Sequence, residues 1–210
     1  MQLILASSSP RRHELLALLG LAFEVYPSDF HEHQLAGLSP LEQVKYFALE
    51  KARSVAKVHP QAYVLGSDTV IDLDGHTLGK PRDLIDARAM LSRLAGRVHH
   101  VHTAVALMNH EQHNEAVEVS TAVVRMKAEV GDVYERYLAS GESLGKAGSY
   151  AIQGLGGDLV EHIDGDYTAV VGLPLKLVAC LLQSVGYPIR VDVEELYRRK
   201  PYANWSRFAV

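Results

Sequence analysis

The feature that most constrains the fold is an apolar run over residues 63–72, followed by Asp74-Gly75 and a shorter run over residues 76–79. Two such runs around an Asp-Gly pair predict a β-hairpin, because that pair favours the tight turn that joins antiparallel strands. Nearer the start of the chain, residues 3–6 predict a buried strand that runs into a helix. The sheet is therefore expected to mix hairpins with strand–helix units.

The rest of the chain continues this alternation of strands and helices. Long strands are predicted over residues 98–108 and 116–126, with a second hairpin turn at Asp164-Gly165. Helices are predicted from Pro10 to Gly20, over 40–58 and 83–94, between Asp132 and Gly141, and from Pro174 to Gly186. We predict an α/β fold: a mixed twisted sheet with flanking helices, in two closely packed lobes around a central cleft.

Composition limits the classes of function. The 210 residues carry 21 Lys and Arg against 25 Asp and Glu, and a net charge of −4 is not typical of a general nucleic-acid binder. The longest apolar runs fall far short of about 18 residues, so we expect no membrane span. No signal-peptide pattern is found, and we expect a cytoplasmic protein. The single cysteine, Cys180, excludes an intrachain disulfide, and its apolar neighbours predict a core thiol.

Two adjacent arginines, Arg11 and Arg12, open the first predicted helix, directly after Ser7-Ser8-Ser9-Pro10. The N-terminal end of a helix is already positive, so acidic residues are the ordinary choice there. Cations at that end favour a bound anion, and phosphate is the usual one. Two solvated surface arginines are the alternative.

Two charged residues interrupt apolar patterns. Lys51 lies on the apolar face of the predicted helix over residues 40–58, so it either reaches solvent or meets a negative partner. Asp68 lies inside the first strand of the hairpin, where carboxylates are uncommon. A two-residue turn would place Lys80 opposite Thr69, one step from Asp68, which suits a structural salt bridge and a functional site equally well.

Glycines gather in residues 141–157, around the motif Gly148-Ser149-Tyr150-Ala151-Ile152-Gln153-Gly154. Glycines allow positive φ and the close approach of a ligand to the backbone. Gln153 is the one amide among apolar neighbours, and a buried glutamine needs hydrogen-bond partners. The edge of a nucleotide base or a backbone carbonyl would supply them.

Other chemistries fit the sequence less well. Neither a nucleophile elbow nor a GxxxxGK[ST] or GxGxxG phosphate loop is present. His100 and His102 would share one strand face, but a zinc site also needs a third ligand from elsewhere. Cations, a carboxylate, glycine-rich backbone and an amide together favour a metal-assisted site that acts on the phosphates of a nucleotide.

A series of motifs runs in order from about residue 3 to residue 185. The motifs are Leu5-Ala6-Ser7-Ser8-Ser9-Pro10-Arg11-Arg12, Glu50-Lys51-Ala52, Gly66-Ser67-Asp68-Thr69, Gly79-Lys80-Pro81, Thr103-Ala104-Val105, the glycine motif given above, and Val171-Gly172-Leu173-Pro174-Leu175. In this order they resemble the Maf-like nucleoside triphosphate pyrophosphatases. The form Tyr-Ala-Ile-Gln-Gly is similar to the branch of that family that acts on dTTP and UTP.

The resemblance implies hydrolysis of a nucleoside triphosphate to its monophosphate and pyrophosphate, with a divalent metal (Mg²⁺ or Mn²⁺), in a homodimeric enzyme. It implies that Asp68 is the catalytic residue and that Glu32 and Asp68 lie at the metal. The chain departs from the family at His31, where an aspartate is common. The residues that we expect to bind the substrate are Arg11, Arg12, Lys51, Thr69, Lys80 and Gln153.

On this reading, residues 1–186 form a single Maf-like catalytic domain and residues 187–210 an extension without an assigned role. Water would attack the α-phosphorus in line, and Gln153 would read the Watson–Crick edge of a pyrimidine. Two alternatives use the same residue types. One is a non-catalytic nucleotide sensor in cell-division control, and the other is a pyrophosphatase for modified purine nucleotides.

Overall fold

A computed structural model describes residues 1–31, 35, 37–128 and 132–208. Its strands form one sheet in the order β2-β1-β3-β5-β6-β7, with β4 paired to β3. β1 runs parallel to β2 and β3, and the other pairs are antiparallel, so the sheet is mixed as predicted. The strands are β1 (Leu3–Leu5), β2 (Glu24–Val25), β3 (Tyr63–Leu73), β4 (His76–Leu78), β5 (Val98–Asn109), β6 (Asn114–Met126) and β7 (Val160–Asp164).

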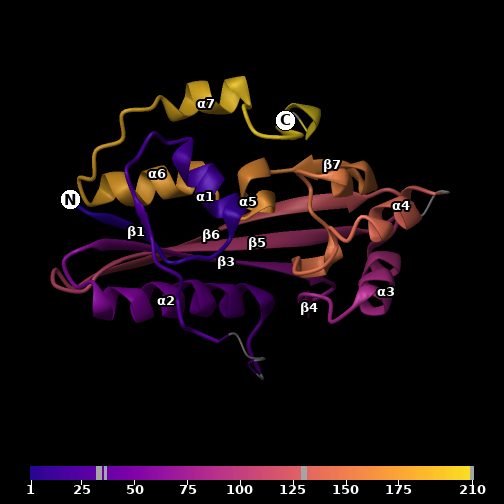
Figure 1. Cartoon of the computed structure of the whole chain (residues 1–210), viewed down its shortest axis with the longest axis horizontal. Coiled ribbons are helices and arrows are strands. Elements are labelled where there is room, and N and C mark those ends of the chain that lie inside the picture. Colours follow the sequence, from indigo (N-terminus) through magenta and orange to yellow (C-terminus); the bar gives the residue numbers. More distant parts are fainter. Residues whose placement is uncertain (32–34, 36, 129–131, 209–210) are drawn as a thin grey trace.

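Helices flank the sheet and close one of its ends. The helices are α1 (Pro10–Ala17), α2 (Pro40–Val58), α3 (Leu84–Leu94), α4 (Val133–Ala139), α5 (Tyr167–Val171), α6 (Leu175–Ser184) and α7 (Val193–Arg199), with 3₁₀ turns η1 (Ala147–Ser149), η2 (Leu155–Leu159) and η3 (Trp205–Phe208). In Figure 1, α2 lies below the sheet, α1, α5 and α6 lie above it, and α3 and α4 gather at the right-hand end.

Two separate apolar clusters pack against the two faces of the sheet. Residues of β3 alternate between them: Val64 and Val70 belong to the cluster that includes α2, whereas Leu65 and Ile71 belong to the cluster that includes α1 and α6. Successive side chains of a strand point to opposite faces. Asp68 therefore lies on the α2 face of β3, and Thr69 lies on the α1 face.

Strand β3 has a gap in its pairing on one edge. On that edge β1 pairs with Tyr63–Leu65 and β4 pairs only from Ile71 onward, while the opposite edge is paired with β5 throughout. The chain leaves β1 at Leu5 and enters α1 at Pro10, at the mouth of this gap. Asp68 and Thr69 lie in the gap, next to the carboxyl end of a parallel strand, which is where ligands commonly bind in open α/β sheets.

Most predicted elements are confirmed, and two details are wrong. The Asp74-Gly75 hairpin has the expected register, and α2 spans the predicted residues. Asp164-Gly165 is not a hairpin turn, because β7 pairs back to β6 and Asp166 then caps α5 by accepting a hydrogen bond from the Thr168 amide. Cys180 is exposed rather than in the core, because it lies on the outer side of α6. Among the described residues, no helix has both the length and the apolar character needed to cross a membrane.

Candidate active site

A cavity of about 590 Å³ lies at the gap in β3, in the position of the predicted central cleft. Its walls come from the β1–α1 connection, α2, β3, the end of β4, the glycine-rich segment over residues 145–153, and α5. Every predicted site residue that the structure describes lines this cavity: Arg11, Arg12, Lys51, Asp68, Thr69, Lys80 and Gln153. Glu32 lies outside the described residues.

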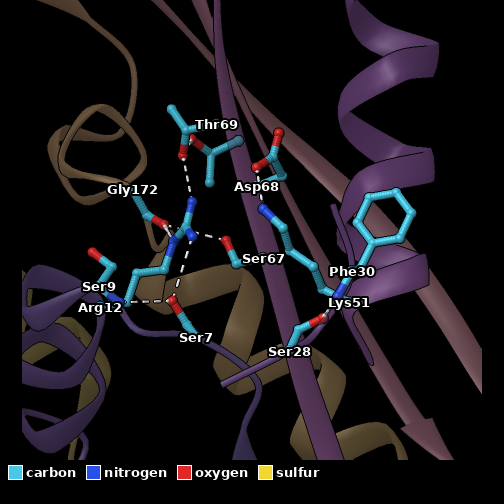
Figure 2. Close-up of polar contacts among 11 residues, drawn as sticks. Ser7, Ser9, Arg12, Ser28, Phe30, Lys51, Ser67, Asp68, Thr69 and Gly172 are labelled. Carbon is cyan, nitrogen blue, oxygen red and sulfur yellow. Dashed lines mark hydrogen bonds and ion pairs between the residues drawn. The ribbon is translucent and has the colours of Figure 1, made fainter. Parts of the chain in front are cut away.

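Lys51 and Asp68 form an ion pair at the floor of the cavity. The Lys51 Nζ atom lies 2.6 Å from Asp68 Oδ1, and the two side chains are only 11% and 8% exposed (Figure 2). Lys51 therefore meets a negative partner instead of reaching solvent. A buried ion pair adds little stability, because the cost of desolvation offsets the attraction. Its place beside a large cavity favours a functional role.

Gly66 allows this ion pair to form, because helix α2 crosses directly over it. A Cβ atom at Gly66 would lie 2.2 Å from the Ala48 carbonyl oxygen and 2.7 Å from the Ala52 amide nitrogen. Only a residue without a side chain permits so close a contact between a strand and a helix backbone. The approach brings Lys51, on the same turn of α2, within reach of Asp68.

Arg12 is held on the other face of β3. Its Nε donates to the Gly172 carbonyl at 2.8 Å, and its Nη2 donates to Thr69 Oγ1 at 3.2 Å (Figure 2). The Thr103 hydroxyl oxygen lies 3.0 Å from that of Thr69. Arg12 therefore ties the start of α1 to β3 and to the loop between α5 and α6, and it contributes a fixed positive charge to the wall of the cavity.

Further positive charge gathers beside Arg12. Burial, followed by the charge of Arg12, lowers the pKa of Arg11 below its ordinary value. Burial, followed by the charge of Arg11, also lowers the pKa of Lys146. The side chain of the N-cap residue Ser9 makes no capping hydrogen bond, and the first turn of α1 holds no acidic residue, so no side chain of that turn offsets the positive helix end at the cavity. A polyanion bound here would relieve the repulsion among these cations.

The glycine-rich segment presents Gln153 at the cavity wall. The Oε1 atom of Gln153 is buried and has no hydrogen-bond partner among the described residues. The neighbouring backbone is held, because the Ala151 amide donates to Tyr137 Oη at 3.0 Å and the Gly148 amide donates to the Gly79 carbonyl at 3.0 Å. A buried amide oxygen without a partner is costly, which favours a ligand that donates a hydrogen bond to it.

Comparison with known proteins agrees with this geometry. The family model for Maf-like proteins matches residues 2–185. The chain belongs to the Maf-like protein family. This Maf-like protein is 46% identical to a protein of Symbiobacterium thermophilum named dTTP/UTP pyrophosphatase. The 188 aligned residues cover 90% of this chain and 96% of that one.

Two more relatives carry the same name. The protein of Myxococcus xanthus is 47% identical over 187 residues, which cover 89% of this chain and 94% of that one. The protein of Bacillus pumilus is 42% identical over 185 residues, which cover 88% of this chain and 97% of that one. A solved structure of a HAM1 protein from Coxiella burnetii is 20% identical, with a TM-score of 0.45, over 61% of this chain and 74% of that one.

The structure of this Maf-like protein adds site residues that the sequence reasoning missed. Lys146 lies in the glycine-rich segment, and Phe30 and Phe47 also line the cavity. The signal for Lys146 was its place between Gly145 and Ala147 in a segment already singled out. Phe30 and Phe47 meet only in three dimensions, with ring centroids 5.8 Å apart, so no local pattern pointed to them.

Proposed function

We propose that this protein hydrolyses dTTP and UTP to the nucleoside monophosphate and pyrophosphate. One observation carries the proposal: the cavity holds a buried carboxylate paired with a lysine, a group of mutually repelling cations, and a buried amide oxygen that lacks a partner. The carboxylate can act on water, the cations can bind a triphosphate, and the amide oxygen can select a base. Family membership and the names of the relatives support the same activity.

The cations would bind the triphosphate. Arg11, Lys80 and Lys146 line the cavity together with the N-terminal end of α1, where a phosphate also meets backbone N–H groups. Charge grows on the leaving pyrophosphate as the bond to the α-phosphorus breaks. Cations that are already in place stabilise that charge without further rearrangement, which is usually the largest single contribution to such catalysis.

Asp68 would act at the α-phosphorus. Its carboxylate is held by Lys51 on the α2 side of β3 and lines the cavity. There it would orient the attacking water and accept the proton that the water loses, so that the water oxygen bonds to the α-phosphorus in line while the bond to the pyrophosphate oxygen breaks. The reaction consumes one water and needs no covalent bond to the protein.

The donor set fits a divalent cation that arrives with the nucleotide. Of the described residues at the cavity, Asp68 carries the carboxylate, and the described residues hold no cluster of three or more metal-ligating side chains. Magnesium in nucleotide sites is commonly held by one or two carboxylates together with phosphate oxygens and waters. When bound, such a cation neutralises phosphate charge and makes nearby water more acidic. Asp68 and Glu32 stay our predicted ligands, for Mg²⁺ or Mn²⁺.

Gln153 would read the base. Its free Oε1 can accept a hydrogen bond from the N3–H of thymine or uracil, and its amide nitrogen can donate to a base carbonyl. Thr69 would contact the base or the sugar. The homodimer, the cytoplasmic location and the division of the chain into residues 1–186 and 187–210 also stay predictions.

The decisive experiment is a product analysis of the wild type and of Asp68→Asn with common and modified nucleoside triphosphates in the presence of Mg²⁺. We expect the wild type to release pyrophosphate from dTTP and UTP, and Asp68→Asn to lose about 10²–10⁴-fold in rate. Asp72→Asn is the matched control: Asp72 lies on the same strand outside the cavity and accepts hydrogen bonds from the Gly75 amide and His102.

Three outcomes would contradict the proposal. Binding of triphosphates without any pyrophosphate release would favour the nucleotide sensor. Selective cleavage of modified purine nucleotides would favour the alternative enzyme. Equal turnover by Asp68→Asn and the wild type would remove Asp68 from the mechanism.

A further inference from the structure

The last part of the chain lies beyond the segment matched by the family model and folds back onto the body. After α6 the chain forms α7 and then η3, which ends above α5 and β7 (Figure 1). Tyr187, Leu196 and Trp205 all join the main apolar cluster. We call residues 187–208 the tail. Most of the tail is exposed or half-buried, and these three buried side chains attach it to the body.

Ring contacts and a hydrogen bond anchor the tail on the two sides of Asn204. The Trp205 ring, only 3% exposed, stacks on Tyr167 with centroids 5.8 Å apart and meets Tyr197 edge-on at 4.9 Å. On the preceding residue, the Ala203 carbonyl accepts a hydrogen bond of 2.5 Å from the Tyr167 hydroxyl. Asn204 adopts a φ of +61°, a conformation that asparagine tolerates better than most residues. The contacts of Ala203 and Trp205 therefore fix the backbone of Asn204 independently of its side chain.

The Asn204 side chain binds both backbone carbonyls that flank Gln153. Its Nδ2 donates to the Ile152 carbonyl at 2.8 Å and to the Gly154 carbonyl at 3.0 Å. A Cβ atom at Gly157 would lie 2.7 Å from that nitrogen, so the glycine leaves room for the contact. On the opposite side, Arg207 Nη1 lies 3.4 Å from Asn204 Oδ1, which orients the amide with its nitrogen toward the carbonyls.

Gln153 depends on this support because its own side-chain oxygen is not held. Its Oε1 atom has no partner among the described residues, so the direction in which the amide points is set by the backbone of residues 152–154. In the part of the chain that the structure describes, Asn204 is the side chain bonded to both flanking carbonyls. Movement of this backbone by a fraction of an ångström would misdirect the amide without disturbing the Lys51–Asp68 pair.

We propose that Asn204 is a positioning residue for base selection and that the tail is thereby part of the specificity apparatus. The proposal rests on the proposed function, in which Gln153 reads the base. Asn204 lines no part of the cavity and touches neither Asp68 nor the cations. Its loss therefore acts on the choice among bases and on KM, whereas the rate of the chemical step depends on groups that stay in place.

Two substitutions test the amide. Asn204→Gly keeps the positive φ and removes both donors, and Asn204→Asp keeps the shape but places a carboxylate against two carbonyls. For each variant, kcat and KM are measured with dTTP and with dGTP. We expect the ratio of kcat/KM for dTTP over dGTP to fall about tenfold, while kcat for dTTP changes by less than about threefold.

Asp192→Ala is the matched control, because it loosens the tail elsewhere. Asp192 caps α7 by accepting a hydrogen bond from the Glu195 amide at 3.0 Å. Its removal lowers thermal stability, and we expect the nucleotide ratio to stay at the wild-type value. Hydrogen exchange at the amides of residues 151–157 is measured alongside and is expected to be faster in the Asn204 variants than in the control.

The outcomes separate the two proposals. An unchanged nucleotide ratio in both Asn204 variants would overturn the role of Asn204, and so would an equal loss in Asp192→Ala. Absence of pyrophosphate release from the wild type would instead overturn the proposed function. In that case faster exchange at residues 151–157 in the Asn204 variants alone would still support the positioning of this segment by the tail.

Discussion

Substitution of His99 by glutamine should remove a large part of the acid sensitivity of the fold. His99 lies on β5, is 1% exposed, and has its Nε2 atom 2.8 Å from the Tyr150 hydroxyl, next to the cavity. Its Nδ1 atom is buried with no hydrogen-bond partner among the described residues. A second proton would therefore place a charge in an apolar site and leave one N–H without an acceptor. Burial, with a smaller contribution from His100, lowers the pKa of His99 to about 4.

The magnitude follows from proton linkage. Below pH 6.5 the unfolded chain binds a proton at His99 that the folded chain does not bind, so folding stability falls as the pH drops from 6.5 toward 4. The free energy of unfolding should lose about 2 kcal/mol between pH 7.5 and pH 5, and about 3 kcal/mol once both states are protonated. The glutamine in His99→Gln cannot take up the proton, so this contribution disappears.

Urea unfolding at pH 7.5 and at pH 5 measures the effect for the wild type and His99→Gln. The other titrating groups cancel when the pH dependence of the variant is subtracted from that of the wild type. His100→Gln is the matched control, because His100 is the exposed neighbour on the same strand. A difference in pH dependence below about 0.5 kcal/mol between the wild type and His99→Gln would refute the reasoning.

Two further substitutions test the base-reading and packing arguments. Gln153→Ala should reduce the preference for dTTP over other nucleotides about tenfold to a hundredfold, with a smaller effect on kcat, and an unchanged preference in competition assays would contradict the assignment. Gly66→Ala should destabilise the protein by about 1–3 kcal/mol or more and reduce activity, because the methyl group meets the backbone of α2 at Ala48. In urea unfolding, Gly79→Ala is the control for stability, since its methyl group meets open space.

Local signals account for the elements that the sequence predicted well. Helix α2 begins where expected because Ser39 and Glu42 form a capping box and Pro40 occupies the first turn. The first hairpin has the expected register because an Asp-Gly pair fixes a two-residue turn. Both signals lie within a few residues of the structure they specify.

Contacts between distant segments account for what the sequence left open. The register argument brought Lys80 toward Asp68, and both line the same cavity, but it gave no sign that Lys51 on α2 forms an ion pair with Asp68. That pairing depends on the close approach at Gly66, which no local pattern describes. The tail is a similar case, because the aromatic packing that anchors Trp205 involves Tyr167 and Tyr197 rather than its sequence neighbours.

The gap in β3 explains why one short segment supplies so much of the site. With one edge unpaired, Asp68 and Thr69 are open to a ligand from the side, while pairing with β5 fixes their positions. Alternation along the strand sends Asp68 toward Lys51 and Thr69 toward Arg12, so the two faces of the sheet each add a cation to one cavity. A shift of β3 by one residue would exchange these faces and separate both pairs. The register of β3 is therefore as important to the proposed chemistry as the identity of the side chains it carries.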